Sequence, residues 1–356
     1  MIIPFLKALY HLEDCWLHEE TEYSALLEEI ELHALGSQIY SLLKGSGRIL
    51  DVPHFFRERL SRTYEACFYQ NMLIKHETEL LMRKLEAGGL SVIPLKGAVM
   101  AERFFGHFAA RGTSDIDLLV KPEHLEEAVR IVREAGYSRP AADSPVHYHT
   151  EWMKEAPGLP EPLVVELHWS FVPQGSSAVS MIAAWEESIP LAGHSLARGL
   201  SAEYTFYTLC LHGASHHMDS FKHVLDLVHL LCEHGDHIDL AKVIERAVKD
   251  RTFNRVRAAL SITYSLIPEL HRLKPLPFQP KLPVGSSAGE LSKLNKLMFN
   301  LSLLDSWSYK VTHLQRILFP SRELARYSVE AGSSAASGPR LYFQLYRQRL
   351  RRLLGG

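Results

Sequence analysis

The sequence is poor in cysteine and has no long apolar run. The first shortage argues against a disulfide-rich secreted protein, and the second argues against a membrane-spanning protein. Its 356 residues hold four cysteines, and none of them forms a C-x-x-C pair: Cys15, Cys67, Cys210 and Cys232. No stretch approaches the roughly 20 apolar residues that a membrane-spanning helix needs. The first residues also lack a basic segment followed by a long apolar run. We therefore expect a cytoplasmic protein with reduced thiols and no transmembrane segment.

The sequence also lacks an excess of charge of either sign. The formal net charge is -2 and the pI is about 6.9, so no global field favours wrapping nucleic acid. We therefore expect no template nucleic acid as a partner. Hydrophobic content of 46% and charged content of 22% are ordinary for a soluble globular protein. The length predicts two or three domains, and no internal repeat is visible.

Two aspartates open an apolar run and are the strongest chemical signal in the chain. Residues 115–120 read D-I-D-L-L-V, and alternate side chains of a strand share a face. Asp115 and Asp117 would then lie side by side, where their charges repel unless a cation holds them. Carboxylates suit Mg²⁺ or Mn²⁺. The alternative is a capping or surface acidic pair, but the surrounding motifs favour metal binding.

A turn with a lysine and a glycine precedes this strand. Residues 92–95 form a short apolar run that predicts a strand, and a helix-forming segment runs from 98 to 105. Gly97 permits a close turn, and the helix amides behind it would point at a phosphate, with Lys96 adding charge. Ser114 either joins the nucleotide contacts or ends the loop. The alternative is an ordinary strand-to-helix turn in which Lys96 pairs with a surface acid.

A third acidic residue lies in a later apolar run. In residues 163–169, Val164, Glu166 and His168 would share one face of a strand. If this strand lies beside that of Asp115, Glu166 completes a carboxylate triad. Otherwise it is a solvent-facing strand residue.

These three pieces together resemble the DNA polymerase beta-like nucleotidyltransferase superfamily, and more narrowly a bacterial group of uncharacterised nucleotidyltransferases. The resemblance lies in L-K-G at 95–97, R-G-T-S-D-I-D-L-L-V at 111–120 and E-L-H-W at 166–169. It covers about 80 of the 356 residues. Where the superfamily has Gly-Ser or Gly-Gly in the turn, this chain has Gly97-Ala98, so Lys96 would replace the turn hydroxyl in binding phosphate.

The resemblance implies transfer of a nucleoside monophosphate from an NTP to an acceptor, with release of pyrophosphate. Asp115 and Asp117 would hold Mg²⁺ or Mn²⁺ on the triphosphate, and Glu166 would help to hold a second ion or act as general base. The acceptor could be a small molecule or another protein. The alternative is a catalytically inactive nucleotide-binding regulatory or partner protein with the same fold. Base identity, acceptor and oligomeric state are not readable from the sequence.

The order of patterns predicts an α+β fold in which a small mixed-sheet core lies between helical regions. We expect an N-terminal helical region (1–88), a catalytic core (89–173), a helical C-terminal domain (174–330), and a flexible tether with a basic terminal helix (331–356). Apolar spacing predicts helices at about 53–87, from a cap at Asp239 to 248, at 253–266 and at 291–304.

Histidines and a basic tail complete the candidate features. His212, His216 and His217 invite a zinc hypothesis, but the H-E-x-x-H signature is absent because Gly213 stands at the Glu position. We therefore predict core or supporting histidines, and the resemblance implies that His212, His216 and Asp226 line the acceptor side of the cleft. The tail at 340–353 predicts a docked terminal helix, with a membrane-surface helix as the alternative.

Overall fold

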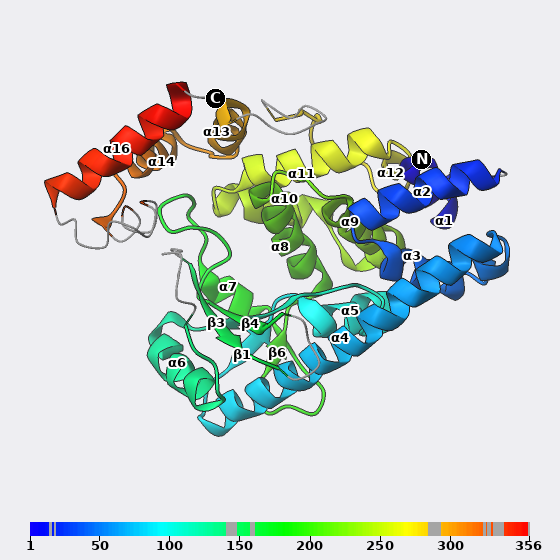
Figure 1. Cartoon of the computed structure of the whole chain (residues 1–356), viewed down its shortest axis with the longest axis horizontal. Helices are drawn as coiled ribbons and strands as arrows, with labels where there is room; N and C mark the ends of the chain where they lie inside the picture. Colours follow the sequence, from blue (N-terminus) through cyan, green and yellow to red (C-terminus); the bar gives the residue numbers. More distant parts are fainter. Residues whose placement is uncertain are drawn as a thin grey trace.

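The computed structural model describes most of the chain and is mainly helical around a small sheet (Figure 1). The described residues are 1–13, 16–17, 19–139, 148–156, 161–283, 293–322, 325, 329 and 338–354. The α-helices are α1 (Ile2–Leu9), α2 (Glu20–Leu32), α3 (Gly36–Gly45), α4 (His54–Ala87), α5 (Gly97–Phe105), α6 (Leu125–Glu134), α7 (Met181–Glu186), α8 (Ala202–Ser215), α9 (Phe221–His234), α10 (Leu240–Lys249), α11 (Phe253–Leu266), α12 (Leu270–Leu273), α13 (Lys293–Ser302), α14 (Trp307–Leu318) and α16 (Pro339–Leu354).

A four-stranded mixed sheet lies within the predicted core at 89–173. Its strands lie in the order β1 (Val92–Pro94), β2 (Asp115–Val120), β4 (Leu163–His168) and β3 (His149–Lys154). β2 and β4 run parallel, and the two outer pairs are antiparallel. This confirms the predicted α+β class and the prediction that the three apolar runs belong to one sheet. A separate two-stranded ribbon pairs β5 (Ile189–Pro190) with β6 (Arg198–Gly199).

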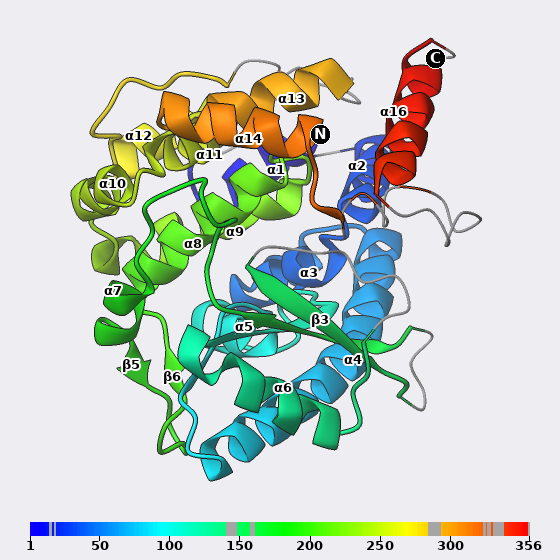
Figure 2. The ribbon, with the colours of Figure 1, turned by 90° about the vertical axis from the view of Figure 1, so that its left-hand side faces the viewer.

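One face of the sheet is covered by α4 and α6 and is wholly apolar at its centre. Ile116 and Leu118 of β2 and Val165 and Leu167 of β4 are buried there in one cluster with residues of α4 and α6. These are the positions that the period-2 pattern assigns to one face. The opposite face therefore carries Asp115, Asp117, Glu166 and His168. Figure 2 shows α4 and α6 against the sheet, away from α8 and α9.

The helical regions on either side are joined by one continuous core. A single buried cluster runs from Ile2 in α1 through Met100 in α5 to Leu270 in α12, and includes most apolar positions of α8 and α9. The predicted helices at about 53–87, 239–248 and 253–266 are confirmed as α4, α10 and α11. Among the described residues no helix is long and apolar enough to cross a membrane.

The last helices lie at the far end of the C-terminal region (Figure 1). Residues 293–302 form α13, within the predicted helix at 291–304, and α16 occupies the predicted basic tail. Most of the predicted tether lies outside the described residues.

A carboxylate on α4 ties that helix to the β5–β6 ribbon. Glu86 accepts hydrogen bonds from the backbone N–H groups of Leu196 (2.6 Å) and Ala197 (2.8 Å), and its other oxygen lies 2.8 Å from His194 Nδ1. Burial disfavours the charged carboxylate, but these hydrogen bonds outweigh it and lower the pKa of Glu86 to about 2. The contact therefore depends on ionised Glu86.

The depressed pKa predicts an acid-dependent loss of stability. In the unfolded chain the pKa of Glu86 returns toward 4.5, so its contribution is complete above that pH and is lost as the pH falls toward about 2. Glu86→Gln should remove this contribution. Urea unfolding of both proteins at about pH 5 and about pH 3 should show a smaller pH dependence in the variant. Equal pH dependence in the two proteins would contradict the assignment.

Candidate active site

A cleft of 520 Å³ lies between the polar face of the sheet and the helices α8 and α9. Its sheet side includes Lys96, Ser114, Asp115, Glu166 and His168, all residues at or near strand ends. Its helical side includes Thr208, His212, His216, Lys222 and His223. The fold therefore brings together polar groups from positions 96 to 223, and the two sides come from the predicted core and the predicted C-terminal domain.

The three predicted carboxylates meet at this cleft: Asp115 and Glu166 line it, and Asp117 lies fully buried beside them. Asp117 and Glu166 are direct partners in the parallel pair β2–β4, and Asp115 pairs with Val164 on the same face. Ligand oxygens of Asp115, Asp117 and Glu166 lie within 4.8 Å of one another. The expectation that Glu166 lies beside the two aspartates is confirmed, although its chemical role stays a prediction.

Asp117 is the most deeply buried member of the triad. Its side chain is fully buried, and Oδ1 lies 3.1 Å from Lys96 Nζ and 3.0 Å from His168 Nε2. Burial opposes its charge, but Lys96 and His168 outweigh burial and hold its pKa well below the usual range. The second oxygen, Oδ2, is buried without a hydrogen-bond partner among the described residues. A buried carboxylate oxygen of this kind fits a cation ligand.

Asp115 and Glu166 lie in contrasting environments. Burial and the neighbouring Asp117 charge raise the pKa of Asp115. Burial also disfavours ionised Glu166, but its hydrogen bond to His168 Nε2 (2.9 Å) lowers the pKa. Lys96 and His168 thus supply the positive charge that holds the acidic cluster together in this structure. A divalent cation would add charge at Asp115, the member whose charged form is least favoured.

The turn before α5 takes the predicted strand-to-helix form. Gly97 begins α5 with φ +74°, a left-handed conformation that favours glycine. Lys96 precedes the helix and its side chain turns to Asp117. The lysine therefore contacts the acidic cluster, and phosphate binding by Lys96, Gly97 or Ser114 stays a prediction.

A buried asparagine of α4 shapes the loop that leads to Asp115. Asn71 Nδ2 donates to the carbonyls of Phe108 (2.7 Å) and Arg111 (2.8 Å), and its Oδ1 accepts from Thr113 N–H (3.3 Å). Thr113 Oγ1 in turn donates to the backbone carbonyl of Asp115 at 3.2 Å. These contacts give the N-terminal helical region a part in orienting the start of β2.

A buried ion pair connects the same loop to α9. Arg111 Nε and Nη2 each lie 2.7 Å from one oxygen of Asp226, and both side chains are almost fully buried. The resemblance implied that Asp226 lines the acceptor side of the cleft, but it does not belong to the cleft lining. Its carboxylate is held by Arg111 because a buried guanidinium needs a bidentate partner. Asp226 therefore holds the loop before β2 against α9, and its carboxylate does not line the cleft.

The predicted histidines divide into two groups. His212 and His216 line the cleft, as the resemblance implied, and their rings lie with that of His223 at centroid distances of 4.6 to 5.6 Å. Burial lowers the pKa of His212 and His216, and lowers that of His223 to about 4. His217 instead packs against Phe299. The absence of zinc at His212, His216 and His217 stays a prediction.

Two further groups of the cleft were not predicted as site residues. His149 of β3 lies directly opposite His168, and only the pairing of β3 with β4 reveals that. Lys222 of α9 lines the cleft near Asp115, and the Arg111 charge together with burial lowers its pKa to about 8. Alternation along β4 already placed His168 beside Glu166, so that residue could have been found from the sequence.

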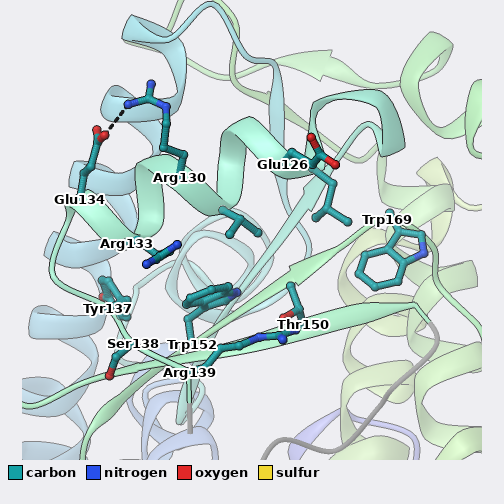
Figure 3. A pocket seen from close by; sticks show the side chains of 12 residues that line it. Glu126, Arg130, Arg133, Glu134, Tyr137, Ser138, Arg139, Thr150, Trp152 and Trp169 are labelled. Atoms are coloured by element: carbon teal, nitrogen blue, oxygen red, sulfur yellow. Dashed lines mark hydrogen bonds and ion pairs between the residues drawn. The ribbon is translucent and has the colours of Figure 1, made fainter. Parts of the chain in front are cut away.

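A larger cavity of 1040 Å³ lies on the other face of β3 (Figure 3). Thr150 and Trp152 line it, and they alternate along β3 with His149 and Glu151 of the cleft. Trp169 and the Arg130–Glu134 ion pair also border it. It lies away from the three carboxylates, so the smaller cleft is the candidate active site.

The mixed sheet, the adjacent carboxylates and the lysine–glycine turn are the three features on which the resemblance to nucleotidyltransferases was drawn. Residues 19–268 match the family described as uncharacterised nucleotidyltransferase, and the chain belongs to this family. No curated protein matches the chain. A solution structure of the antibiotic-resistance factor ANT(2'')-Ia is similar at 19% identity, with a TM-score of 0.31, and the match covers 58% of this chain and 98% of that chain.

The buried ion pair makes a prediction about stability. Asp226→Ala leaves the Arg111 guanidinium buried and unpaired, so the free energy of unfolding should fall by about 3–5 kcal/mol. Urea denaturation measures this loss. Replacing both partners, as Arg111→Met with Asp226→Leu, should restore most of it. A loss below about 1 kcal/mol, the range of exposed pairs, would show that the two groups are not held as described.

Proposed function

We propose that the protein is a metal-dependent nucleotidyltransferase that moves a nucleoside monophosphate from an NTP to an acceptor and releases pyrophosphate. The observation that carries the proposal is the register of β2 and β4, which pairs Asp117 with Glu166 and gathers three carboxylates at the cleft. Such a constellation, with a basic turn beside it, meets the geometric requirements of phosphoryl-type transfer, where catalysis is mostly positioning and charge stabilisation.

Asp115 and Asp117 would bind Mg²⁺ or Mn²⁺ together with the triphosphate. Their oxygens are hard ligands, and the unpartnered Asp117 Oδ2 supports a place for a cation. When bound, the cation supplies positive charge to the phosphate oxygens of an in-line displacement. Asp117 would keep its charge throughout because its pKa is low, whereas Asp115 would be held in its charged form by the cation.

Glu166 would act on the acceptor hydroxyl in one of two ways. It would help to hold a second cation, or it would take the hydroxyl proton as general base. Its carboxylate is half-buried beside His168 and faces the cleft, which suits both roles. His168 would orient Glu166 through the 2.9 Å hydrogen bond.

Two lysines would meet the triphosphate from opposite sides of the cleft. Lys96 lies at the start of α5, whose N-terminal amides add partial positive charge. Lys222 lies near the start of α9 across the cleft. Positive charge at both places would offset the charge that develops on the leaving pyrophosphate. Arg111 is less available because it is paired with Asp226.

The helical side of the cleft would receive the acceptor. Apart from Lys222, its polar groups are the imidazoles of α8 and α9 and the Thr208 and Ser215 hydroxyls, which offer hydrogen bonds without fixed charge, and the Phe171 ring nearby offers an apolar contact. This lining suits a hydroxyl-bearing small molecule or a hydroxyl side chain of another protein. A template nucleic acid is not expected, because the formal net charge is -2.

Replacing either aspartate should abolish the metal-dependent stabilisation by nucleotide. Wild type should gain thermal stability from NTP with Mg²⁺ or Mn²⁺ by mass action. Asp115→Asn and Asp117→Asn should fold but lose the metal-dependent part of that gain, whereas the exposed control Asp236→Asn should retain it. Thermal unfolding with and without metal measures this. Absence of any metal-dependent gain in wild type would reject the assignment of the two aspartates.

Turnover separates an enzyme from the inactive nucleotide-binding alternative. The enzyme requires release of pyrophosphate that depends on an acceptor in cell extract and disappears in both aspartate variants. A pyrophosphate assay with each NTP measures this. Metal–nucleotide binding without any pyrophosphate release would favour the nucleotide-binding partner protein.

The role of Lys96 makes a separate prediction about affinity. Lys96→Ala removes a positive charge beside the phosphates, so NTP should bind about tenfold or more weakly, in the range of a charged hydrogen bond. Folding should persist because His168 still contacts Asp117. Calorimetry of wild type, Lys96→Ala and the exposed control Lys44→Ala decides the question. Unchanged affinity in Lys96→Ala would remove this lysine from the phosphate contacts.

A further inference from the structure

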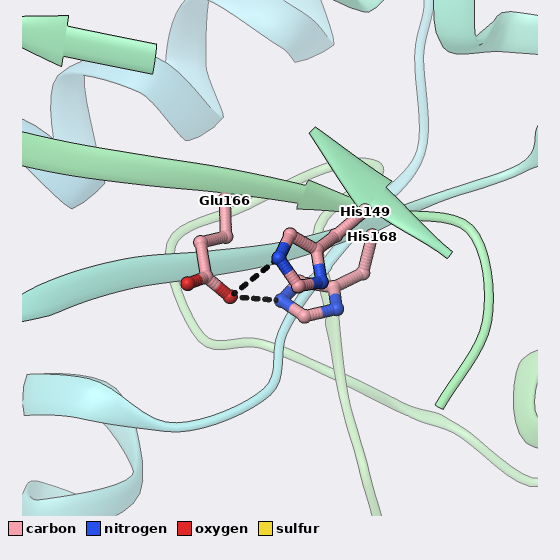
Figure 4. A group of neighbouring side chains, drawn as sticks. All are labelled: His149, Glu166 and His168. Atoms are coloured by element: carbon pink, nitrogen blue, oxygen red, sulfur yellow. Dashed lines mark hydrogen bonds and ion pairs between the residues drawn. The ribbon is translucent and has the colours of Figure 1, made fainter. Parts of the chain in front are cut away.

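The cleft contains a second group of possible metal ligands that includes two imidazoles. His149, Glu166 and His168 each offer one ligand atom, and these atoms lie within 4.8 Å of one another. The rings of His149 and His168 lie side by side and turn a nitrogen toward the same oxygen of Glu166 (Figure 4). This group shares Glu166 with the all-carboxylate triad.

Sheet geometry builds the group. His149 and His168 are direct partners in the antiparallel pair β3–β4, and Glu166 lies two residues before His168 on the same face. Direct cross-strand partners hold their side chains close together, and here the ring centroids are 4.8 Å apart. Both histidines are about nine-tenths buried. The donors are therefore fixed by backbone pairing rather than by a loop.

The separations suit ligands of one cation. Glu166 Oε2 lies 2.9 Å from His168 Nε2 and 3.9 Å from His149 Nε2. Ligands that each lie about 2.0–2.2 Å from a common metal are separated by about 3–4 Å. The carboxylate of Glu151 lies 3.6 Å from His149 Nε2, on the same side. His168 Nε2 also lies 3.0 Å from Asp117 Oδ1, so ligation would require a neutral His168, and the cation would then supply the positive charge that the imidazole gives Asp117 in this structure.

We propose that His149, Glu166 and His168 form a binding site for a divalent transition-metal cation, next to the carboxylate site and bridged to it by Glu166. Imidazole nitrogen suits Zn²⁺, Fe²⁺ and their neighbours, whereas Mg²⁺ prefers oxygen ligands alone. Two histidines and one carboxylate are a donor set of first-row transition metals. This proposal depends on the proposed function only in that Glu166 belongs to both groups of ligands.

This site gives the cleft two cation positions of different chemistry. The triad of Asp115, Asp117 and Glu166 offers oxygen alone, and the group of His149, Glu166 and His168 offers nitrogen and oxygen. A carboxylate shared between two cations holds them close together, as in two-metal sites. A transition metal on the nitrogen side would therefore lie where the acceptor hydroxyl is expected.

The test uses the whole chain, freed of metal with a chelator and titrated with Mn²⁺ or Co²⁺ without nucleotide. Pulsed EPR of bound Mn²⁺ should resolve coupling to imidazole nitrogen in wild type. His149→Gln should weaken Co²⁺ binding by more than about tenfold, because loss of even a supporting partner of a metal ligand costs that much. His54→Gln, an exposed histidine of α4 outside the cleft, should leave the affinity and the nitrogen coupling unchanged.

The two proposals fail in different ways. Mn²⁺ with oxygen coupling alone in wild type, or unchanged Co²⁺ affinity in His149→Gln, would show that the two histidines form only a hydrogen-bonded cluster and would overturn this inference. Nitrogen-coupled Mn²⁺ that persists in Asp115→Asn would support it even if no pyrophosphate is ever released. The wild-type spectrum decides the question if His149→Gln does not fold.

Discussion

Repulsion among three carboxylates on one face of a small sheet is the constraint on which the site depends. Asp115, Asp117 and Glu166 are brought within 4.8 Å by strand register, and two of them are mostly withdrawn from water. Such a cluster is stable only with compensating positive charge. Lys96 and His168 supply it at Asp117, and the raised pKa of Asp115 shows where compensation is incomplete. A divalent cation would supply the positive charge that is missing at Asp115.

The surrounding helices hold this cluster in place from three sides. Asn71 of α4 fixes the loop before β2 through three hydrogen bonds, and the Arg111–Asp226 pair joins that loop to α9. α9 also brings Lys222 to the cleft. The buried cluster from Ile2 to Leu270 packs the N-terminal helices, α5 and the C-terminal helices into one core around these contacts.

The sheet and its acidic residues could be predicted from the sequence because period-2 alternation fixes which side chains share a face. Asp115, Asp117, Glu166 and His168 all follow from that rule once β2 and β4 are neighbours. His149, Asn71 and Lys222 could not be found in this way, because their place depends on strand pairing or helix packing between distant segments.

Asp226 illustrates the limit of a motif. The resemblance implied a residue that faces the acceptor, whereas the buried Arg111 requires the carboxylate as its partner. Local patterns show which residues are polar in an apolar helix, but they do not show which buried charge each one must neutralise. His217 was predicted as a core or supporting histidine, and its packing against Phe299 agrees with that prediction.

The most direct test of the account is a crystal structure of the chain with Mn²⁺ and a non-hydrolysable NTP analogue, recorded with anomalous scattering. The proposed function predicts an anomalous peak in contact with Asp115 and Asp117, next to Glu166, and triphosphate oxygens on the same ion with Lys96 beside them. An analogue bound in the cavity beside Trp152 and Trp169, or a manganese ion away from all three carboxylates, would contradict it.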